Sequence, residues 1–263
     1  MSQALLTRRE GAVLVLSNNN VAARNALSPE FYAAVTAALR DAAADPAVGA
    51  IVLTGEGGHF CAGGDLRQLA KRRELPVQER RAKLEGLHDL IRSVRDCPKP
   101  VIAAVEGAAA GAGLSLALAC DMLVAAKNAV FSVAYVKVGL TPDGGATAFL
   151  AEFVSRQLLT ELCLTGERIS GERLHALGPV NRLAEPGHAL ADAVALAGQI
   201  AGGPGQAMAW IKELCRQAPR NTLQEQLELE AQYMVRAQET EESREGIGAF
   251  LEKRTPDFTQ LRR

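Results

Sequence analysis

The sequence predicts an α/β fold with a helical C-terminal part, and three observations support this prediction. Short apolar runs at residues 50–54 and 101–105 are typical of buried strands. Helix-like stretches with recognisable N-terminal signals alternate with these runs, an order that favours α/β architecture. From about residue 189 to residue 253 the pattern is largely helical.

The first elements along the chain are a strand and a helix. Residues 11–16 alternate weakly between apolar and polar and predict a strand. Ser28 is a suitable N-cap, Pro29 suits the first helical position, and Glu30 places an acid in the first turn. The apolar stripe of this helix consists of Phe31, Val35, Ala38 and Leu39.

The next segment begins with a glycine-containing turn. Residues 60–65, Phe-Cys-Ala-Gly-Gly-Asp, follow the buried strand at 50–54 and predict that turn. Residues 71–81 are rich in charge and contain Pro76, so we expect a mobile surface segment there. A helix is predicted around residues 84–94.

The second half of the chain continues this alternation. A helix is predicted at about residues 112–119 and a further strand at 131–138. Residues 141–145, Thr-Pro-Asp-Gly-Gly, predict a turn into the next helix. The helical C-terminal part is broken at residues 202–205, Gly-Gly-Pro-Gly, and at Pro219.

Charge and cysteine content exclude several classes of protein. The formal net charge of −1 argues against a basic nucleic-acid-binding surface. Five widely spaced cysteines contain no Cys-x-x-Cys pair, and the histidines share no ligand spacing, so neither a disulfide framework nor a metal site is predicted. The first ten residues lack the apolar core of a signal peptide, and we expect a soluble, cytoplasmic protein with no membrane partner.

The most informative stretch is residues 101–121, VIAAVEGAAAGAGLSLALACD. It begins as a buried strand, passes through Gly107, Gly111 and Gly113, and continues as a helix. A glycine-rich passage that leads into a helix leaves main-chain N–H groups unpaired at the helix N-terminus, where the helix dipole favours negative charge. The stretch therefore predicts a site for an anion.

Two nucleotide-binding motifs do not account for this stretch. A dinucleotide fingerprint that started at Gly111 and Gly113 would need Gly or Ala at position 116, which is Leu116. A phosphate-binding P-loop needs a lysine after its glycines, and residues 107–121 contain none.

A serine-hydrolase nucleophile is a third alternative. Residues 113–117, Gly-Leu-Ser-Leu-Ala, come close to the nucleophile-elbow motif, and Asp143 with His175 or His188 follows in suitable order. The elbow serine, however, stands directly at the end of a strand. Here we expect Ser115 inside the helix, which disfavours this alternative.

Several segments in order resemble the crotonase (enoyl-CoA hydratase/isomerase) superfamily. They are residues 23–27, 60–66, 98–121, 139–145 and 245–254, and the resemblance covers essentially the whole chain. It implies a crotonase-type spiral of repeated ββα units with C-terminal helices that build trimers, commonly paired into hexamers.

The resemblance also implies a division of the chain and a substrate. We expect the spiral core with its acyl-CoA site in residues 1–195 and the helical trimerisation region in residues 196–263. The substrate would be an acyl-CoA thioester. Coenzyme A is part of that substrate, so no separate cofactor is expected, and neither nucleic acid nor membrane is an expected partner.

The shared chemistry of the superfamily is an oxyanion hole for the thioester carbonyl. Carried onto this sequence, its two donors would be the main-chain N–H groups of Ala62 and Ala112. Arg24 resembles the position that meets the phosphates or adenine of coenzyme A. Phe250 and Lys253 would contact coenzyme A from a neighbouring subunit.

The remaining expected substrate-binding residues lie in or beside the same turns. They are Ala26, Leu27, Gly64, Asp65, Leu66, Gly111, Ser115, Tyr135 and Leu140. Leu66, Leu69, Val136 and Leu140 are expected to line an apolar acyl pocket.

The sequence departs from the superfamily pattern at two important positions. Hydratases of the superfamily use two glutamates, which would fall at Ser115 and Tyr135, and neither residue is a carboxylate. Asp143 resembles the catalytic aspartate of the branch that contains the 1,2-epoxyphenylacetyl-CoA isomerases and oxepin-CoA hydrolase-like proteins. Residues 221–230 and 244–258 also resemble that branch. A single carboxylate suits a 1,3-proton shift.

The favoured hypothesis is therefore an acyl-CoA isomerase with Asp143 as acid and base. An acyl-CoA hydrolase or dehalogenase on the same fold, with Asp143 as nucleophile, is the first alternative. An enoyl-CoA hydratase and a non-catalytic binding protein are the remaining alternatives.

Overall fold

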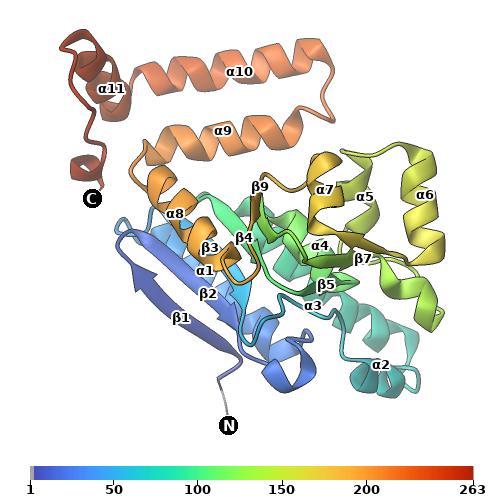
Figure 1. Ribbon diagram of the computed structural model, residues 1–263. Helices are drawn as coiled ribbons and strands as arrows, with labels where there is room; N and C mark the ends of the chain where they lie inside the picture. The colour runs from blue at the N-terminus through green and yellow to red at the C-terminus, as the bar shows by residue number, and fades with distance from the viewer. Residues whose placement is uncertain (1–2, 263) are drawn as a thin grey trace.

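The computed structural model describes residues 3–262 and confirms the α/β fold with a helical C-terminal part (Figure 1). The main sheet has six strands in the order β1-β2-β3-β4-β6-β9, and all neighbours are parallel except β1 and β2. Its strands are β1 (Leu5–Glu10), β2 (Val13–Asn18), β3 (Ala50–Gly55), β4 (Val101–Val105), β6 (Met122–Ala126) and β9 (Arg182–Ala184).

A second sheet of three short strands stands beside the first, in the order β5-β7-β8. These strands are β5 (Ala108–Ala110), β7 (Val130–Ser132) and β8 (Arg168–Ser170). Consecutive strands alternate between the sheets: β4 and β6 enter the main sheet, whereas β5 and β7 enter the small one. Because each ββα repeat places one strand in each sheet, the chain forms a spiral, as predicted.

Helices cover the two sheets and extend beyond them (Figure 1). The α-helices of residues 3–262 are α1 (Pro29–Ala44), α2 (Leu66–Arg72), α3 (Val77–Asp96), α4 (Ala112–Ala119), α5 (Ala146–Ala151), α6 (Arg156–Thr165), α7 (Gly171–Ala176), α8 (Ala189–Ala201), α9 (Gly205–Gln217), α10 (Leu223–Gln238) and α11 (Glu241–Leu251). Three short 3₁₀ helices are η1 (Val21–Ala23), η2 (Ala134–Val138) and η3 (Thr259–Leu261). None of the helices within these residues is both long and apolar enough to cross a membrane.

The core lies between the main sheet and the helices packed on it. Strands β3 and β4 are buried along almost their whole length, which explains their continuous apolar sequences. α8 packs on β3, β4 and β6, while α1 packs against α3. α1 begins as its sequence predicts, because the Ser28 hydroxyl accepts a hydrogen bond from the Phe31 N–H at 3.3 Å.

Two strand predictions are wrong in detail, and one strand was missed. The strand expected at residues 11–16 is the second arm of a hairpin, β2, and β1 was missed because its side chains are mostly exposed. The expected strand at residues 131–138 ends at Ser132 and continues as η2. A short apolar run does not distinguish these two backbone conformations.

The charged segment at residues 71–81 is largely helical instead of irregular. α2 extends to Arg72, and α3 begins at Val77, earlier than the helix expected at 84–94. Pro76 is the N-cap residue of α3, where its missing N–H has no cost, so this proline begins a helix and does not interrupt one.

The C-terminal helices stand away from the sheets (Figure 1). α9 and α10 run antiparallel beside each other, with the rings of Trp210 and Tyr233 stacked at 5.8 Å. The expected domain boundary between residues 195 and 196 falls inside α8, which packs on the main sheet. We therefore propose residues 202–204, between α8 and α9, as the division between core and C-terminal region.

Candidate active site

A cavity of about 360 Å³ lies where the turn at residues 61–65 meets α2, α3, α4 and η2. Apolar side chains form much of its wall, among them Leu66 and Leu69 of α2 and Leu84 and Leu87 of α3. The opposite side is formed by the start of α4 and by the segment that ends in Asp143. The cavity therefore brings together both glycine-containing turns and the acidic turn that the sequence singled out.

The two glycine-containing turns touch because glycine allows their backbones to approach closely. The Cys61 N–H donates to the Ala108 carbonyl at 2.9 Å, and the Ala110 N–H donates to the Cys61 carbonyl at 3.0 Å. A Cβ atom on Gly63 would lie 2.7 Å from the Ala110 carbonyl oxygen, and one on Gly113 would lie 2.4 Å from the Cys61 carbonyl oxygen. Any larger residue would push the turns apart.

Two main-chain N–H groups at this junction have no acceptor among residues 3–262. One belongs to Ala112, the first residue of α4, where no intrahelical partner exists. The other belongs to Gly64, which lines the same cavity. This pair of free donors on one cavity is what an oxyanion hole requires.

The expectation that Ala62 supplies one of these donors is wrong. The Ala62 N–H donates to the Arg24 carbonyl at 3.0 Å and is not free for a ligand. Arg24 offers its carbonyl there because it adopts the left-handed conformation, with φ of 50°. Gly64, expected only as a substrate-binding residue, has the free N–H instead.

Asp143 lines the cavity and is held by two hydroxyl groups. The Tyr135 hydroxyl donates to Asp143 Oδ1 at 2.7 Å. The Ser115 hydroxyl donates to the Asp143 main-chain carbonyl at 2.9 Å. These bonds set the position of the turn and leave Asp143 Oδ2 with no hydrogen-bond donor among residues 3–262.

Burial is the main influence on the acidity of Asp143. It raises the pKa of the carboxyl above its usual value, while the Tyr135 hydrogen bond and the charges of His88 and Arg72 lower the pKa in part. Burial and the nearby Asp143 charge raise the pKa of Tyr135 far above its ordinary value. Tyr135 therefore remains a neutral donor, and Asp143 is the group that can exchange a proton.

The serine-hydrolase alternative is wrong. Ser115 lies inside α4, as expected, and its fully buried hydroxyl has Tyr135 and Asp143 as its partners. His175 Nδ1 lies 2.6 Å from the Val180 carbonyl oxygen, and His188 is the N-cap residue of α8. No histidine within residues 3–262 is bonded to the serine.

The other expected substrate-binding residues fall into two groups. Leu66, Gly111 and Leu140 line the cavity together with Tyr135, as expected. Arg24, Ala26, Leu27, Asp65 and Ser115 do not. Val136, expected in the acyl pocket, is also absent from the wall, whereas Val138 is present, because η2 turns its residues differently from a strand.

Some of these residues hold the first turn in place instead. The Leu27 N–H donates to the Gly63 carbonyl at 2.8 Å, and the Leu27 side chain is buried with that of Ala26. The Asp65 carboxylate accepts from the Arg67 N–H at 2.8 Å and caps α2. They orient the peptide that carries the Gly64 N–H.

Phe250 and Lys253 lie far from this cavity. Phe250 is on α11, which stands at the opposite end of the molecule from α2 (Figure 1), and 82% of its surface is exposed. Neither residue lines the cavity of its own chain. A role at the site of a neighbouring subunit stays a prediction.

Sequence reasoning predicted Leu66 and Leu69 of α2 in the wall but missed Arg72 of α2 and the residues that α1 and α3 supply. Tyr32, Arg72, Lys83, Leu84 and Leu87 line the cavity. The sequence does indicate that Leu84 and Leu87 share one apolar face of α3, because they are three residues apart. Nothing in the sequence indicates that this face turns toward Asp143.

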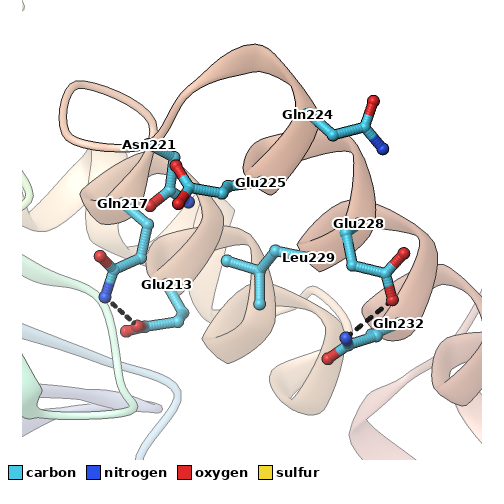
Figure 2. Close-up of a pocket in the computed structure, with 8 residues that line it drawn as sticks. All are labelled: Glu213, Gln217, Asn221, Gln224, Glu225, Glu228, Leu229 and Gln232. Atoms are coloured by element: carbon cyan, nitrogen blue, oxygen red, sulfur yellow. Dashed lines mark hydrogen bonds between the residues drawn. The ribbon is translucent and has the colours of Figure 1, made fainter.

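A larger hollow lies elsewhere and offers no comparable chemistry. It is a groove of about 560 Å³ between α9 and α10, lined mainly by carboxylate and amide side chains (Figure 2). These groups bond one another, as Gln217 does with Glu213 at 2.7 Å. Within residues 3–262, no three His, Cys, Asp or Glu side chains are grouped as metal ligands.

Comparison with known proteins identifies the family. Residues 8–262 match the family model described as enoyl-CoA hydratase/isomerase. This chain belongs to the enoyl-CoA hydratase/isomerase family. The crotonase resemblance is thereby confirmed, and the enoyl-CoA hydratase/isomerase family acts on acyl-CoA thioesters.

Relatives within this family have different activities. The 1,2-epoxyphenylacetyl-CoA isomerase of Escherichia coli K12 is 36% identical over 261 residues, 98% of this chain and 99% of that protein. The 2,3-dehydroadipyl-CoA hydratase of the same organism is 35% identical over 259 residues, which are again 98% of this chain and 99% of that protein. The crystal structure of an enoyl-CoA hydratase from Polaromonas sp. JS666 has a TM-score of 0.94 and 50% identity, covering 96% of this chain and 98% of that one.

Proposed function

We propose that this protein is an acyl-CoA isomerase that moves a proton between two carbons of an unsaturated or ring-derived acyl group. Asp143 is its acid and base, and the N–H groups of Gly64 and Ala112 form its oxyanion hole. The observation that carries this proposal is the composition of the cavity wall. Among the described residues that line it, Asp143 is the single carboxylate, and it shares the cavity with both free N–H groups.

The proposed reaction has two proton transfers. The thioester oxygen accepts hydrogen bonds from Gly64 and Ala112, which makes the neighbouring carbon acidic. Asp143 takes a proton from the acyl group, and the electron pair of the broken C–H bond moves into the thioester to form an enolate. Asp143 then returns the proton to a different carbon, so the double bond moves and the mass is unchanged.

The hydrogen bonds of Asp143 suit this role. Tyr135 donates to Oδ1, so Oδ2 is the oxygen available for the substrate proton. The raised pKa brings the carboxyl closer to the range in which an acid can both take and return a proton at neutral pH.

Hydration is the second candidate, and the relatives favour it. The Polaromonas structure and one E. coli relative are both named hydratases. Against this candidate stands the lack of a second acid on the described wall. Ser115 and Tyr135 occupy the positions at which the superfamily resemblance places the two hydratase glutamates.

One assay separates these candidates. The wild-type protein is given a panel of aliphatic, dienoyl and ring-derived CoA thioesters in D₂O, and products are followed by mass and ultraviolet absorbance. Isomerisation predicts a product with no added water, which carries deuterium only where Asp143 exchanges its proton with D₂O before returning one, and Asp143→Asn should abolish turnover while CoA-thioester binding persists. Addition of water to the double bond would support the hydratase, and release of free coenzyme A or halide would support the hydrolase or dehalogenase. Full activity of Asp143→Asn would contradict the role of Asp143.

A further inference from the structure

Two cationic side chains line the same cavity as Asp143. Arg72 is the last residue of α2, and Lys83 lies in the second turn of α3. Apolar side chains, among them Leu69 and Leu84, line the wall with them. A cavity built for a purely aliphatic acyl group would not need two positive charges in this wall.

Neither cation has a carboxylate partner among residues 3–262. The side chains of Arg72 and Lys83 take part in no ion pair within 4.0 Å and in no hydrogen bond. Arg92, on the same helix as Lys83, is instead bonded to Asp89 at 2.6 Å. An unpaired, partly buried guanidinium beside an ammonium group is suited to bind a carboxylate or phosphate.

The position of Arg72 relative to Asp143 indicates which part of the substrate it meets. Asp143 must lie beside the acyl carbons, because it exchanges their protons. The charge of Arg72 is close enough to lower the pKa of Asp143 and that of Tyr32. α2 begins two residues after Gly64, and its seven residues carry the chain about 10 Å along the helix to Arg72. Arg72 therefore lies on the acyl side, some distance from the thioester.

The cavity is not closed at this end. A second hollow of about 440 Å³ runs between α1 and α3 and shares Tyr32, Arg72 and Lys83 with the cavity. The two cations thus stand at the junction of the cavity and a second groove, whose lining also includes Arg40 and Asp89. The far end of a medium-length acyl chain would lie at this junction.

We propose that Arg72 and Lys83 bind a carboxylate at the far end of the acyl group, so that the substrate is the CoA thioester of a dicarboxylic acid. This proposal rests on the proposed function, which places the acyl group in this cavity and Asp143 beside its carbons. The leucines of α2 and α3 contact the methylene chain, and the two cations neutralise the terminal carboxylate. A phosphate of coenzyme A has the same anionic chemistry and is the alternative source that the test must distinguish.

Binding of unreactive thioethers tests the proposal without any turnover. Carboxyalkyl-CoA and alkyl-CoA thioethers of equal chain length are titrated calorimetrically into the wild type, Arg72→Gln and Lys83→Gln. Each substitution should weaken binding of the carboxyalkyl thioether about five- to tenfold and change binding of the alkyl thioether less than about twofold. Arg73→Gln is the matched control, since this exposed neighbour lines neither hollow, and both affinities should stay at their wild-type values.

Two results would overturn the proposal. Equal weakening of both thioethers and of free coenzyme A would assign the cations to a coenzyme A phosphate. Unchanged binding of the carboxyalkyl thioether in both variants would show that the cations bind no part of the ligand. Because the thioethers do not react, the binding result stands whether or not the isomerase assay succeeds.

Discussion

At the residue scale, the proposed chemistry depends on how Asp143 is surrounded. Burial raises the pKa of its carboxyl, whereas the hydrogen bond from Tyr135 at 2.7 Å favours the ionised form. The Ser115 hydroxyl donates a hydrogen bond to the main-chain carbonyl of Asp143 and not to its carboxyl group. Tyr135 also bonds to this carbonyl, at 3.3 Å, but of the two only Tyr135 reaches the carboxyl group, so their removal should have different effects.

Tyr135→Phe should shift the pH dependence of activity. Without the hydroxyl donor the ionised carboxylate loses a stabilising bond, so the pKa of Asp143 should rise further. Because the ionised form is the base, the acidic limb of the kcat/KM profile should move to higher pH. The measurement is kcat/KM over a series of pH values, with a thioester that the wild type converts. Ser115→Ala is the control and should leave that limb in place, and an unmoved limb in Tyr135→Phe would contradict the assignment.

Ala112→Pro tests the oxyanion hole at little structural cost. Proline is well tolerated at the first position of a helix, where Ala112 stands, and it removes only the N–H. Loss of one such donor should lower kcat/KM about 10²- to 10³-fold. Ala112→Gly keeps the N–H and serves as control. Wild-type turnover in a correctly folded Ala112→Pro protein, as judged by circular dichroism, would exclude the proposed hole.

Sequence reasoning predicted Ala112 and Asp143 as site residues, and both line the cavity, but it chose Ala62, whose N–H is bonded, as the second donor. Residues 60–65 show that glycines make the turn, yet they do not show which N–H is free. The answer depends on Arg24, whose carbonyl takes the Ala62 N–H from a distant part of the chain. Long-range pairing of this kind leaves no local signal.

At the scale of elements, one lysine of α9 connects the C-terminal helices to the core. Lys212 Nζ lies 2.7 Å from Asp121 Oδ2 and donates to the main-chain carbonyls of Cys97 and Lys99. Asp121 also accepts from the Val101 N–H at the start of β4. Burial raises the pKa of Asp121, and the charge of Lys212 opposes this rise. The pair therefore compensates a buried charge while holding α9 against the sheet.

Lys212→Met should destabilise the protein. Breaking a buried pair costs about 3–5 kcal/mol, and partial exposure of both groups, 12% and 24%, reduces the expected loss to about 2–3 kcal/mol. Urea unfolding measures this loss in the free energy of unfolding. Arg216→Met, in the same helix, removes more exposed ion pairs and should cost about 1 kcal/mol or less. Equal stability of Lys212→Met and the wild type would contradict this account.

Some elements could be predicted and others could not, for a physical reason. α1, β3 and α4 have strong local signals, namely a cap, a continuous apolar run and a glycine-rich entry. η2 does not, because Tyr135 is buried against Asp143 while Val136 and Val138 are half-exposed and only Val138 of these two lines the cavity. That pattern follows from the site beside η2 and not from a strand or helix period.

At the scale of the whole molecule, the C-terminal helices expose apolar surface. The large exposed apolar side chains of α9 to α11 are Ile211, Leu223, Leu227, Met234, Val235, Ile247, Phe250 and Leu251. A surface of this kind marks a site of protein contact. Together with the distance of Phe250 and Lys253 from their own cavity, it leads us to propose a homotrimer, or a hexamer of paired trimers, in which α11 approaches a neighbour's site.

Phe250→Asp should weaken this assembly. A charge in an apolar contact between subunits remains without a partner, so the variant should elute with a smaller mass in size-exclusion chromatography with light scattering. If α11 completes a neighbouring site, KM for the thioester should rise in the same variant. Leu164→Asp, an exposed change on α6, is the control and should leave mass and KM unchanged. A wild-type protein that is monomeric would refute the proposal directly.

The sequence by itself determined the fold class, the family, the glycine-rich start of α4 and the candidate acid Asp143. Each of these follows from local sequence patterns, such as an apolar run, a cap or a turn motif, and the family follows from several such segments in order along the chain. The tertiary structure alone decided that Gly64 and not Ala62 has the free N–H, that Tyr135 bonds to Asp143, and that Arg72 and Lys83 line the same cavity. These facts depend on which distant backbone and side-chain groups meet when the spiral closes, because hydrogen bonding and burial are properties of the packed chain.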